Sequence, residues 1–125
     1  MTEKKKILVV EDNLMNKILI RDILDFYGYS VCEAVNGREA LEKARSEKPD
    51  IIIMDLHLPE MDGVTAMKIL KSKDEMKDIP IIALTAAAMK WDEKKIIREG
   101  FDGYVPKPID IKVLMKAVEE KMKSL

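Results

Sequence analysis

The chain has 125 residues, of which 47% are hydrophobic and 36% charged, and its formal net charge is −1. This length predicts a single domain over residues 1–125, and the balance of charges argues against general affinity for nucleic acid or an anionic membrane. The one cysteine, Cys32, excludes an internal disulfide, and the apolar run at residues 7–10 is too short for a signal peptide or a membrane span. We therefore expect a soluble, cytoplasmic protein.

Apolar runs and amphipathic stretches alternate along the chain. The runs Ile7–Val10 and Ile51–Met54 contain no alternating polar residue. Each therefore predicts a strand buried on both faces, as in the centre of a parallel sheet. The intervening stretches repeat apolar residues at helical spacing, and Gly28 and Gly100 mark helix ends. In chain order, the predicted strands cover 6–10, 29–34, 51–54, 81–84 and 103–105, and the predicted helices cover 13–26, 38–47, 64–72, 86–98 and 110 onward.

This alternation of five strands and five helices predicts the fold class. Short loops between such elements imply right-handed crossovers and a parallel sheet with helices on both faces. The chain has no repeat, low-complexity tract or Ser/Gly-rich linker. The expected architecture is a doubly wound α/β domain, with the strand at 29–34 nearer an edge of the sheet.

Polar side chains follow four of the five predicted strands. Glu11 and Asp12 follow the first strand, Asp55 the third, Thr85 the fourth and Lys107 the fifth. Because open α/β sheets bind ligands beyond the carboxyl ends of their strands, we expect these groups to meet in one crevice. Clustered carboxylates suit Mg²⁺, while a hydroxyl and an ammonium suit phosphoryl oxygens. Since a carboxylate can also act as a nucleophile, the pattern predicts a phosphoryl-accepting aspartate beside its metal.

Four sequence segments carry a family resemblance. Ile-Leu-Val-Val-Glu-Asp-Asn, Met-Asp-Leu-x-Leu-Pro-x-Met-Asp-Gly, Leu-Thr-Ala and Lys-Pro occur in order along the whole chain. Together they resemble the receiver domain of two-component response regulators, which implies a flavodoxin-like fold with strand order 2-1-3-4-5. Asn13, with Asn16 three residues later, is similar to receivers of hybrid kinases and of single-domain regulators of cell polarity.

The resemblance implies a role for each acidic residue. Asp55 matches the phosphorylated aspartate and Asp12 the direct carboxylate ligand of Mg²⁺. Glu11 matches the acidic neighbour that holds the metal largely through water. The backbone carbonyl of His57 matches a further metal ligand. Its side chain is expected to face solvent, with metal ligation by the imidazole as the alternative.

The resemblance also implies how a switch would operate. Thr85 matches the hydroxyl that moves to bond the phosphoryl group, and Lys107 matches the lysine that pairs with a phosphoryl oxygen. The Lys107–Pro108 bond is expected to be cis. Tyr104 matches an aromatic residue that turns inward when Thr85 moves, although a plain packing role is the alternative for Tyr104.

The implied function is a signalling switch and not a conventional enzyme, since its only catalysis would be its own phosphotransfer and dephosphorylation. The donor would be a histidine kinase or a histidine phosphotransfer protein, and the output would be binding of a downstream effector protein. The expected docking face combines the fourth helix, fifth strand and fifth helix around Trp91 and Tyr104, with lysines that fit an ordinary solvated face equally well. These lysines are Lys90, Lys94, Lys95, Lys112 and Lys116.

Other interpretations stay open at this stage. The chain can be a receiver that belongs to a hybrid histidine kinase. An Asp-dependent phosphatase would favour a second Asp where His57 stands, and a flavin carrier would favour a Ser/Thr/Gly-rich loop after the first strand. In the plainest interpretation, Asp12 and Asn13 cap the first helix and Thr85 the fourth. Met89 and Met115 are candidates for a partner surface.

Overall fold

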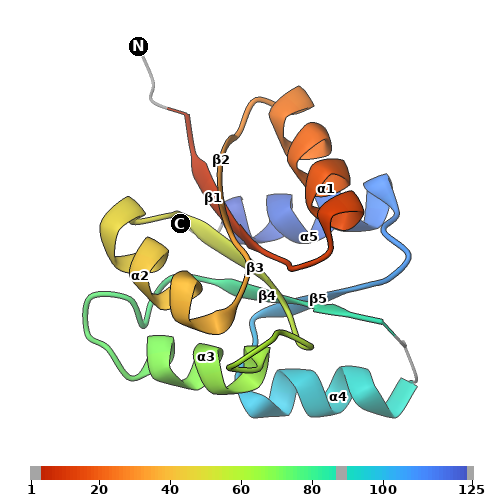
Figure 1. Cartoon of the computed structure of the whole chain (residues 1–125). Coiled ribbons are helices and arrows are strands. Elements are labelled where there is room, and N and C mark those ends of the chain that lie inside the picture. The colour runs from red at the N-terminus through yellow and green to blue at the C-terminus, as the bar shows by residue number, and fades with distance from the viewer. Residues whose placement is uncertain (1–3, 87–89, 124–125) are drawn as a thin grey trace.

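The computed structural model describes residues 4–86 and 90–123 and consists of a five-stranded parallel sheet between two layers of helices (Figure 1). The strand order is β2-β1-β3-β4-β5, so the predicted fold class and strand order are confirmed, including the edge position of β2. The strands are β1 (Lys6–Val10), β2 (Ser30–Ala34), β3 (Ile51–Asp55), β4 (Ile81–Thr85) and β5 (Gly103–Pro106); the helices are α1 (Leu14–Phe26), α2 (Gly37–Glu47), α3 (Gly63–Lys71), α4 (Lys90–Glu99) and α5 (Ile111–Lys123).

Alternate residues of each central strand serve different helix layers. Leu8 and Val10 of β1 pack into the core under α2, α3 and α4, whereas Ile7 and Val9 pack into the core under α1 and α5. Figure 1 shows these two groups of helices on opposite sides of the sheet. Because both faces are covered, β3 is buried along its whole length, which is why its sequence is an unbroken apolar run.

Polar caps begin several helices at the carboxyl edge of the sheet. The side chain of Asn13 accepts a hydrogen bond from the Asn16 backbone N–H at 3.0 Å at the start of α1. Asn36, Asp62 and Asp110 cap α2, α3 and α5 in the same way. The capping role of Asn13 is thus confirmed, and these caps fix where the chain turns between each strand end and the following helix.

The beginning of the fourth helix differs from the prediction. The alanine-rich sequence predicts a helix from Ala86, but Ala86 lies in a bend and α4 begins at Lys90. Alanine favours helix locally, but Ala86 directly follows the last residue of β4, Thr85. The prediction for Met89 concerns a residue outside the described ranges.

Two methionines belong to the buried core. Met115 is only 4% exposed and lies on the buried face of α5 with Leu114 and Val118. The suggestion that Met115 lines a partner surface is therefore wrong. Met76 is 3% exposed and anchors the charged connection between α3 and β4. Both side chains belong to the core, although charged residues lie close to them in the sequence. Across residues 4–86 and 90–123, no helix has the length and apolar character needed to cross a membrane.

Candidate functional site

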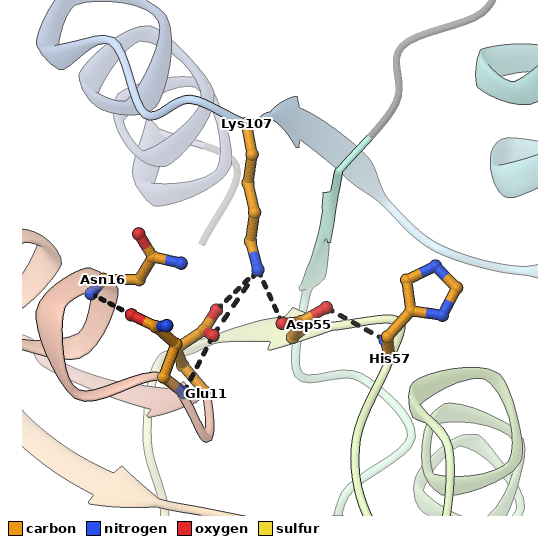
Figure 2. A network of polar contacts seen from close by, with 6 residues as sticks. Glu11, Asn16, Asp55, His57 and Lys107 are labelled. Atoms are coloured by element: carbon orange, nitrogen blue, oxygen red, sulfur yellow. Dashed lines mark hydrogen bonds and ion pairs between the residues drawn. The ribbon is translucent and has the colours of Figure 1, made fainter.

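The sheet brings the predicted polar residues to one edge. Glu11 follows β1 directly, Asp55 is the last residue of β3, and Lys107 follows β5. Figure 2 shows the Lys107 side chain reaching down to Glu11 and Asp55, although these residues come from three different strand ends. The crevice expected from the order of the strands is therefore present.

Asp55 is held at both carboxylate oxygens. Its Oδ2 accepts a hydrogen bond from Lys107 Nζ at 2.6 Å, and its Oδ1 accepts one from the His57 backbone N–H at 2.9 Å. The side chain is almost fully buried within the described structure. These two contacts fix the orientation of the Asp55 carboxylate.

Glu11 shares Lys107 with Asp55. Lys107 Nζ lies 3.0 Å from Glu11 Oε2 as an ion pair and 3.4 Å from Oε1, which also accepts the Asn13 backbone N–H at 3.2 Å. Glu11 is fully buried, and this burial raises the pKa of its carboxyl even though the contact with Lys107 opposes the shift.

Lys107 has two buried carboxylate partners. Burial by itself would lower the pKa of its ammonium, but the hydrogen bonds to Asp55 and Glu11 outweigh burial and raise the pKa. Lys107 is therefore a cation at neutral pH. Its bond to Pro108 is cis, as predicted.

Three carboxylates form a group with the chemistry of a magnesium site. One oxygen each of Glu11, Asp12 and Asp55 lies within 4.8 Å of the others. Asp12 is exposed whereas the other two are buried, so the group opens toward solvent on the Asp12 side. Hard oxygen ligands with room for water are what Mg²⁺ requires, and the residues present fit this ion.

His57 contributes differently from the carboxylates. In Figure 2 its imidazole points away from Asp55 and Lys107, and it belongs to no metal-binding group among the described residues. The imidazole instead lines a groove of about 580 Å³ between α3 and α4, together with Thr85. The predicted solvent-facing side chain is consistent with this position, and the role of the His57 carbonyl stays a prediction.

Thr85 contacts a residue of the carboxylate site, whereas Tyr104 contacts α4. Thr85 is 6% exposed at the end of β4, and its carbonyl accepts the Lys107 backbone N–H at 2.7 Å. Tyr104 packs partly buried against the core under α4, and a hydrogen bond to Glu93 raises the pKa of its hydroxyl. The structure thus ties Thr85 directly to Lys107, and it places Tyr104 beside Glu93 of α4.

Gly63 is a site-supporting residue that sequence reasoning missed. A Cβ atom at this position would overlap the backbone carbonyl of Asp55, and the Gly63 N–H donates to the Leu56 carbonyl at 3.1 Å. The loop after β3 therefore folds back against the strand end. The glycine of the Met-Asp-Gly segment was the available signal, but in the sequence it served only as part of the family resemblance.

Comparisons with known proteins agree with this geometry. The family model of the response regulator receiver domain matches residues 7–119. The chain is 43% identical over 115 residues to the polar-differentiation response regulator DivK of Brucella anthropi, covering 92% of this chain and 94% of that protein.

Solved structures show the same similarity. The receiver domain of a sensor histidine kinase from Pseudomonas aeruginosa, with a magnesium ion coordinated in its active-site cleft, is 31% identical with a TM-score of 0.88, covering 97% of this chain and 99% of that one. The chemotaxis response regulator CheY4 of Vibrio cholerae is 29% identical with a TM-score of 0.88, covering 95% and 99%.

Proposed function

This chain belongs to the response-regulator receiver family, and from that premise we propose that it is a phosphorylation-controlled switch in which Asp55 accepts the phosphoryl group. One observation carries the proposal: a buried carboxylate at the end of a central strand has Lys107 at 2.6 Å and two further carboxylates beside it. The whole chain 1–125 is proposed as one such domain, working in the cytoplasm.

The proposed chemistry begins with the Asp55 carboxylate as the nucleophile. An oxygen of Asp55 attacks the phosphorus of a phosphohistidine, the P–N bond breaks, and its electron pair returns to the imidazole nitrogen. Lys107 offsets charge on a phosphoryl oxygen as a point charge. The product is an acyl phosphate that water hydrolyses, so turnover is limited to the domain's own phosphotransfer and dephosphorylation.

Mg²⁺ is the proposed cofactor. Asp12 and Asp55 would hold it directly, Glu11 would hold it largely through water, and the His57 carbonyl is proposed as a further ligand. When bound, Mg²⁺ would neutralise charge on the phosphoryl oxygens. The grouping of the three carboxylates within 4.8 Å and the magnesium ion in the Pseudomonas aeruginosa receiver support this assignment.

The proposed switch runs from Thr85 to Tyr104. A phosphoryl group on Asp55 adds between one and two negative charges, which attract the Thr85 hydroxyl. Because Thr85 ends β4, its movement displaces the segment that leads to α4, and Tyr104 follows inward. The contact between Tyr104 and Glu93 of α4 supports a connection between the strand and this helix.

The proposed partners are proteins. A histidine kinase or a histidine phosphotransfer protein donates the phosphoryl group, and a downstream effector binds the α4-β5-α5 face, with no role for nucleic acid or membrane. Lys116 lines a groove on that face with Tyr104, and it lines a second groove together with Lys112 and Tyr27. Lys95 lines the groove between α3 and α4. Lys112 and Lys116 thus share one surface of the proposed docking face, and the side chains of Lys90 and Trp91 lie outside the described residues.

The test is an intact-mass measurement after incubation with acetyl phosphate and Mg²⁺. We expect one added phosphoryl group on the unmodified chain and none on Asp55→Asn or in excess EDTA. An adduct that persists in Asp55→Asn would overturn the assignment of Asp55, and an equal adduct in EDTA would overturn that of Mg²⁺.

A further inference from the structure

The loop between β3 and α3 has a strained tip, the segment Pro59–Met61. The Met61 N–H donates to the Pro59 carbonyl at 2.7 Å, and Glu60 between them has a φ of 66°. A three-residue turn with this positive φ is rare and costs conformational energy in a residue that has a side chain. Such a turn persists only where the surrounding structure holds it. Contacts from neighbouring elements must therefore keep the loop tip in place.

Gly37, the first residue of α2, lies directly against the loop tip. A Cβ atom at Gly37 would lie 2.7 Å from the carbonyl oxygen of Met61 and 2.9 Å from its Cβ, so one of the two segments would have to shift. Gly37 is buried, and the Met61 side chain packs against the same core as Ala40 and Ala44 of α2. The α2 helix thus begins in close backbone contact with the loop that follows Asp55.

The close approach to Met61 is the feature that requires a glycine at position 37. The backbone of Gly37 is helical, unlike that of Gly28 and Gly100, which have positive φ. Alanine favours a helix more than glycine does. The capping of α2 is supplied by the Asn36 side chain, which accepts the Glu39 backbone N–H at 2.8 Å. Neither the backbone conformation nor the cap therefore explains Gly37.

The loop connects its tip to the phosphorylation site through His57. The His57 N–H donates to Asp55 Oδ1 at 2.9 Å, and the His57 carbonyl is the proposed further metal ligand. At its other end the loop is closed against the strand, because the Gly63 N–H donates to the Leu56 carbonyl at 3.1 Å and position 63 has no space for a side chain. A displacement of the tip is therefore taken up at His57.

We propose that Gly37 is a positioning residue for the phosphorylation site. Because it lacks a side chain, α2 can hold the loop tip where the His57 N–H meets Asp55 and the His57 carbonyl meets the metal. This role rests on the proposed function. Gly37 acts only through Met61 and the loop, so its effect should appear in the magnesium affinity as well as in the rate of phosphotransfer.

The test measures both quantities on the full chain and on Gly37→Ala. The magnesium affinity is obtained without a phosphodonor from the rise of Tm with Mg²⁺ concentration, since a bound ion stabilises the folded chain by mass action. The labelling rate is measured with acetyl phosphate at saturating Mg²⁺. For Gly37→Ala we expect Kd for Mg²⁺ to rise about tenfold and labelling to slow at least about tenfold, as for a displaced metal ligand and a misplaced nucleophile.

Ala44→Gly is the matched control for lost stability. Ala44 is buried in the same helix, about two turns beyond Gly37. Its replacement weakens the helix and removes a buried methyl group, so Tm should fall, but no atom is added near the loop. This variant should keep the magnesium affinity and the labelling rate of the unmodified chain.

Met61→Ala tests the same contact from the loop side. It withdraws the Met61 side chain from Gly37 and adds no atom, so it keeps the test decisive if Gly37→Ala does not fold. Kd for Mg²⁺ should rise and labelling should slow, both less than in Gly37→Ala.

Three results would overturn the proposal. If the folded Gly37 and Met61 variants keep the unmodified affinity and rate, the positioning role is overturned and the proposed function stands. The role is also overturned if Ala44→Gly loses as much affinity and rate as they do, because lost stability then accounts for the effect. If acetyl phosphate does not label the unmodified chain, the proposed function is overturned and the role of Gly37 with it.

Discussion

At the scale of single residues, the site depends on one cation between two buried carboxylates. Lys107 contacts Asp55 and Glu11, which are 52 and 96 residues away in the sequence. An isolated buried carboxylate is costly, whereas a paired one is tolerated. Lys107 therefore has a structural role before any phosphoryl group arrives, because it compensates the charges that the site requires.

Lys107→Met should destabilise the protein. In EDTA at pH 7, we expect the free energy of unfolding in urea to fall by about 2–4 kcal/mol, because Asp55 and Glu11 would lose their buried partner. Adding Glu11→Gln to this variant should recover part of the loss, since it removes a buried carboxylate. Lys116→Met changes an exposed lysine and should stay within about 0.5 kcal/mol. Equal stability of the Lys107 and Lys116 variants would contradict this account.

The Lys6–Glu47 ion pair provides a pH-dependent prediction. Glu47 Oε1 lies 2.8 Å from Lys6 Nζ, and this hydrogen bond lowers the pKa of Glu47. A lowered folded-state pKa stabilises the protein above the unfolded value of about 4.3, and the effect is lost as the pH falls through the folded value. The Tm difference between the unmodified chain and Glu47→Gln should thus be positive at pH 7 and shrink by pH 3. A Tm difference that stays the same from pH 7 to pH 3 in thermal scans would contradict this stabilisation by the Lys6–Glu47 pair.

At the scale of secondary-structure elements, the turn from β3 into α3 controls where Asp55 points. The turn returns close enough to the strand that position 63 has no space for a side chain. Asp62 then caps α3 through the Thr65 backbone N–H at 2.8 Å. A glycine and a cap together hold this turn against the end of β3, where Asp55 lies next to the carboxylates of Glu11 and Asp12.

Two glycine substitutions distinguish the effect of the β3–α3 turn on Asp55 from the effect of backbone strain alone. Gly63→Ala should lower the free energy of unfolding by about 1–3 kcal/mol through overpacking, and should slow labelling by acetyl phosphate at least about tenfold, because the Asp55 backbone must shift. Gly28→Ala is the control. Its φ of 90° strains an alanine, but no atom lies within 4 Å of the added Cβ. It should cost about 1–2 kcal/mol yet label at the normal rate; normal labelling of Gly63→Ala would refute the role of the turn.

At the scale of the whole molecule, a bound ion should stabilise the fold by linking the ends of β1 and β3. Glu11 and Asp12 are adjacent in the sequence, but only the pairing of β1 with β3 brings Asp55 beside them, so an ion that binds all three favours the folded chain over the unfolded one. At a Mg²⁺ concentration of a hundred times Kd, this linkage contributes about 2.7 kcal/mol. The domain should therefore become measurably more stable in magnesium.

Asp12→Asn tests this coupling. The unmodified chain should show a rise in Tm on adding Mg²⁺, while Asp12→Asn should lose most of that rise and match the unmodified Tm in EDTA, since Asp12 is exposed. Asp78→Asn, at an exposed position before β4, should keep the full response. An undiminished magnesium response in Asp12→Asn would remove this residue from the metal site.

The sequence by itself determined the identity and order of the elements. Unbroken apolar runs such as Ile51–Met54 can be satisfied only by burial on both faces, and their carboxyl ends must share one edge of a parallel sheet. These rules act over a few residues, so they predicted Asp12, Asp55 and Lys107 as neighbours without any coordinates. The strand order itself came from the family resemblance.

Only the tertiary structure decided how those neighbours are paired. It showed that Lys107 serves Glu11 as well as Asp55, that Gly63 has no room for a side chain, and that Met115 is core. It also showed that Ala86 lies outside α4. Each of these facts depends on the space left by distant segments, and local propensity and periodicity carry no information about that space.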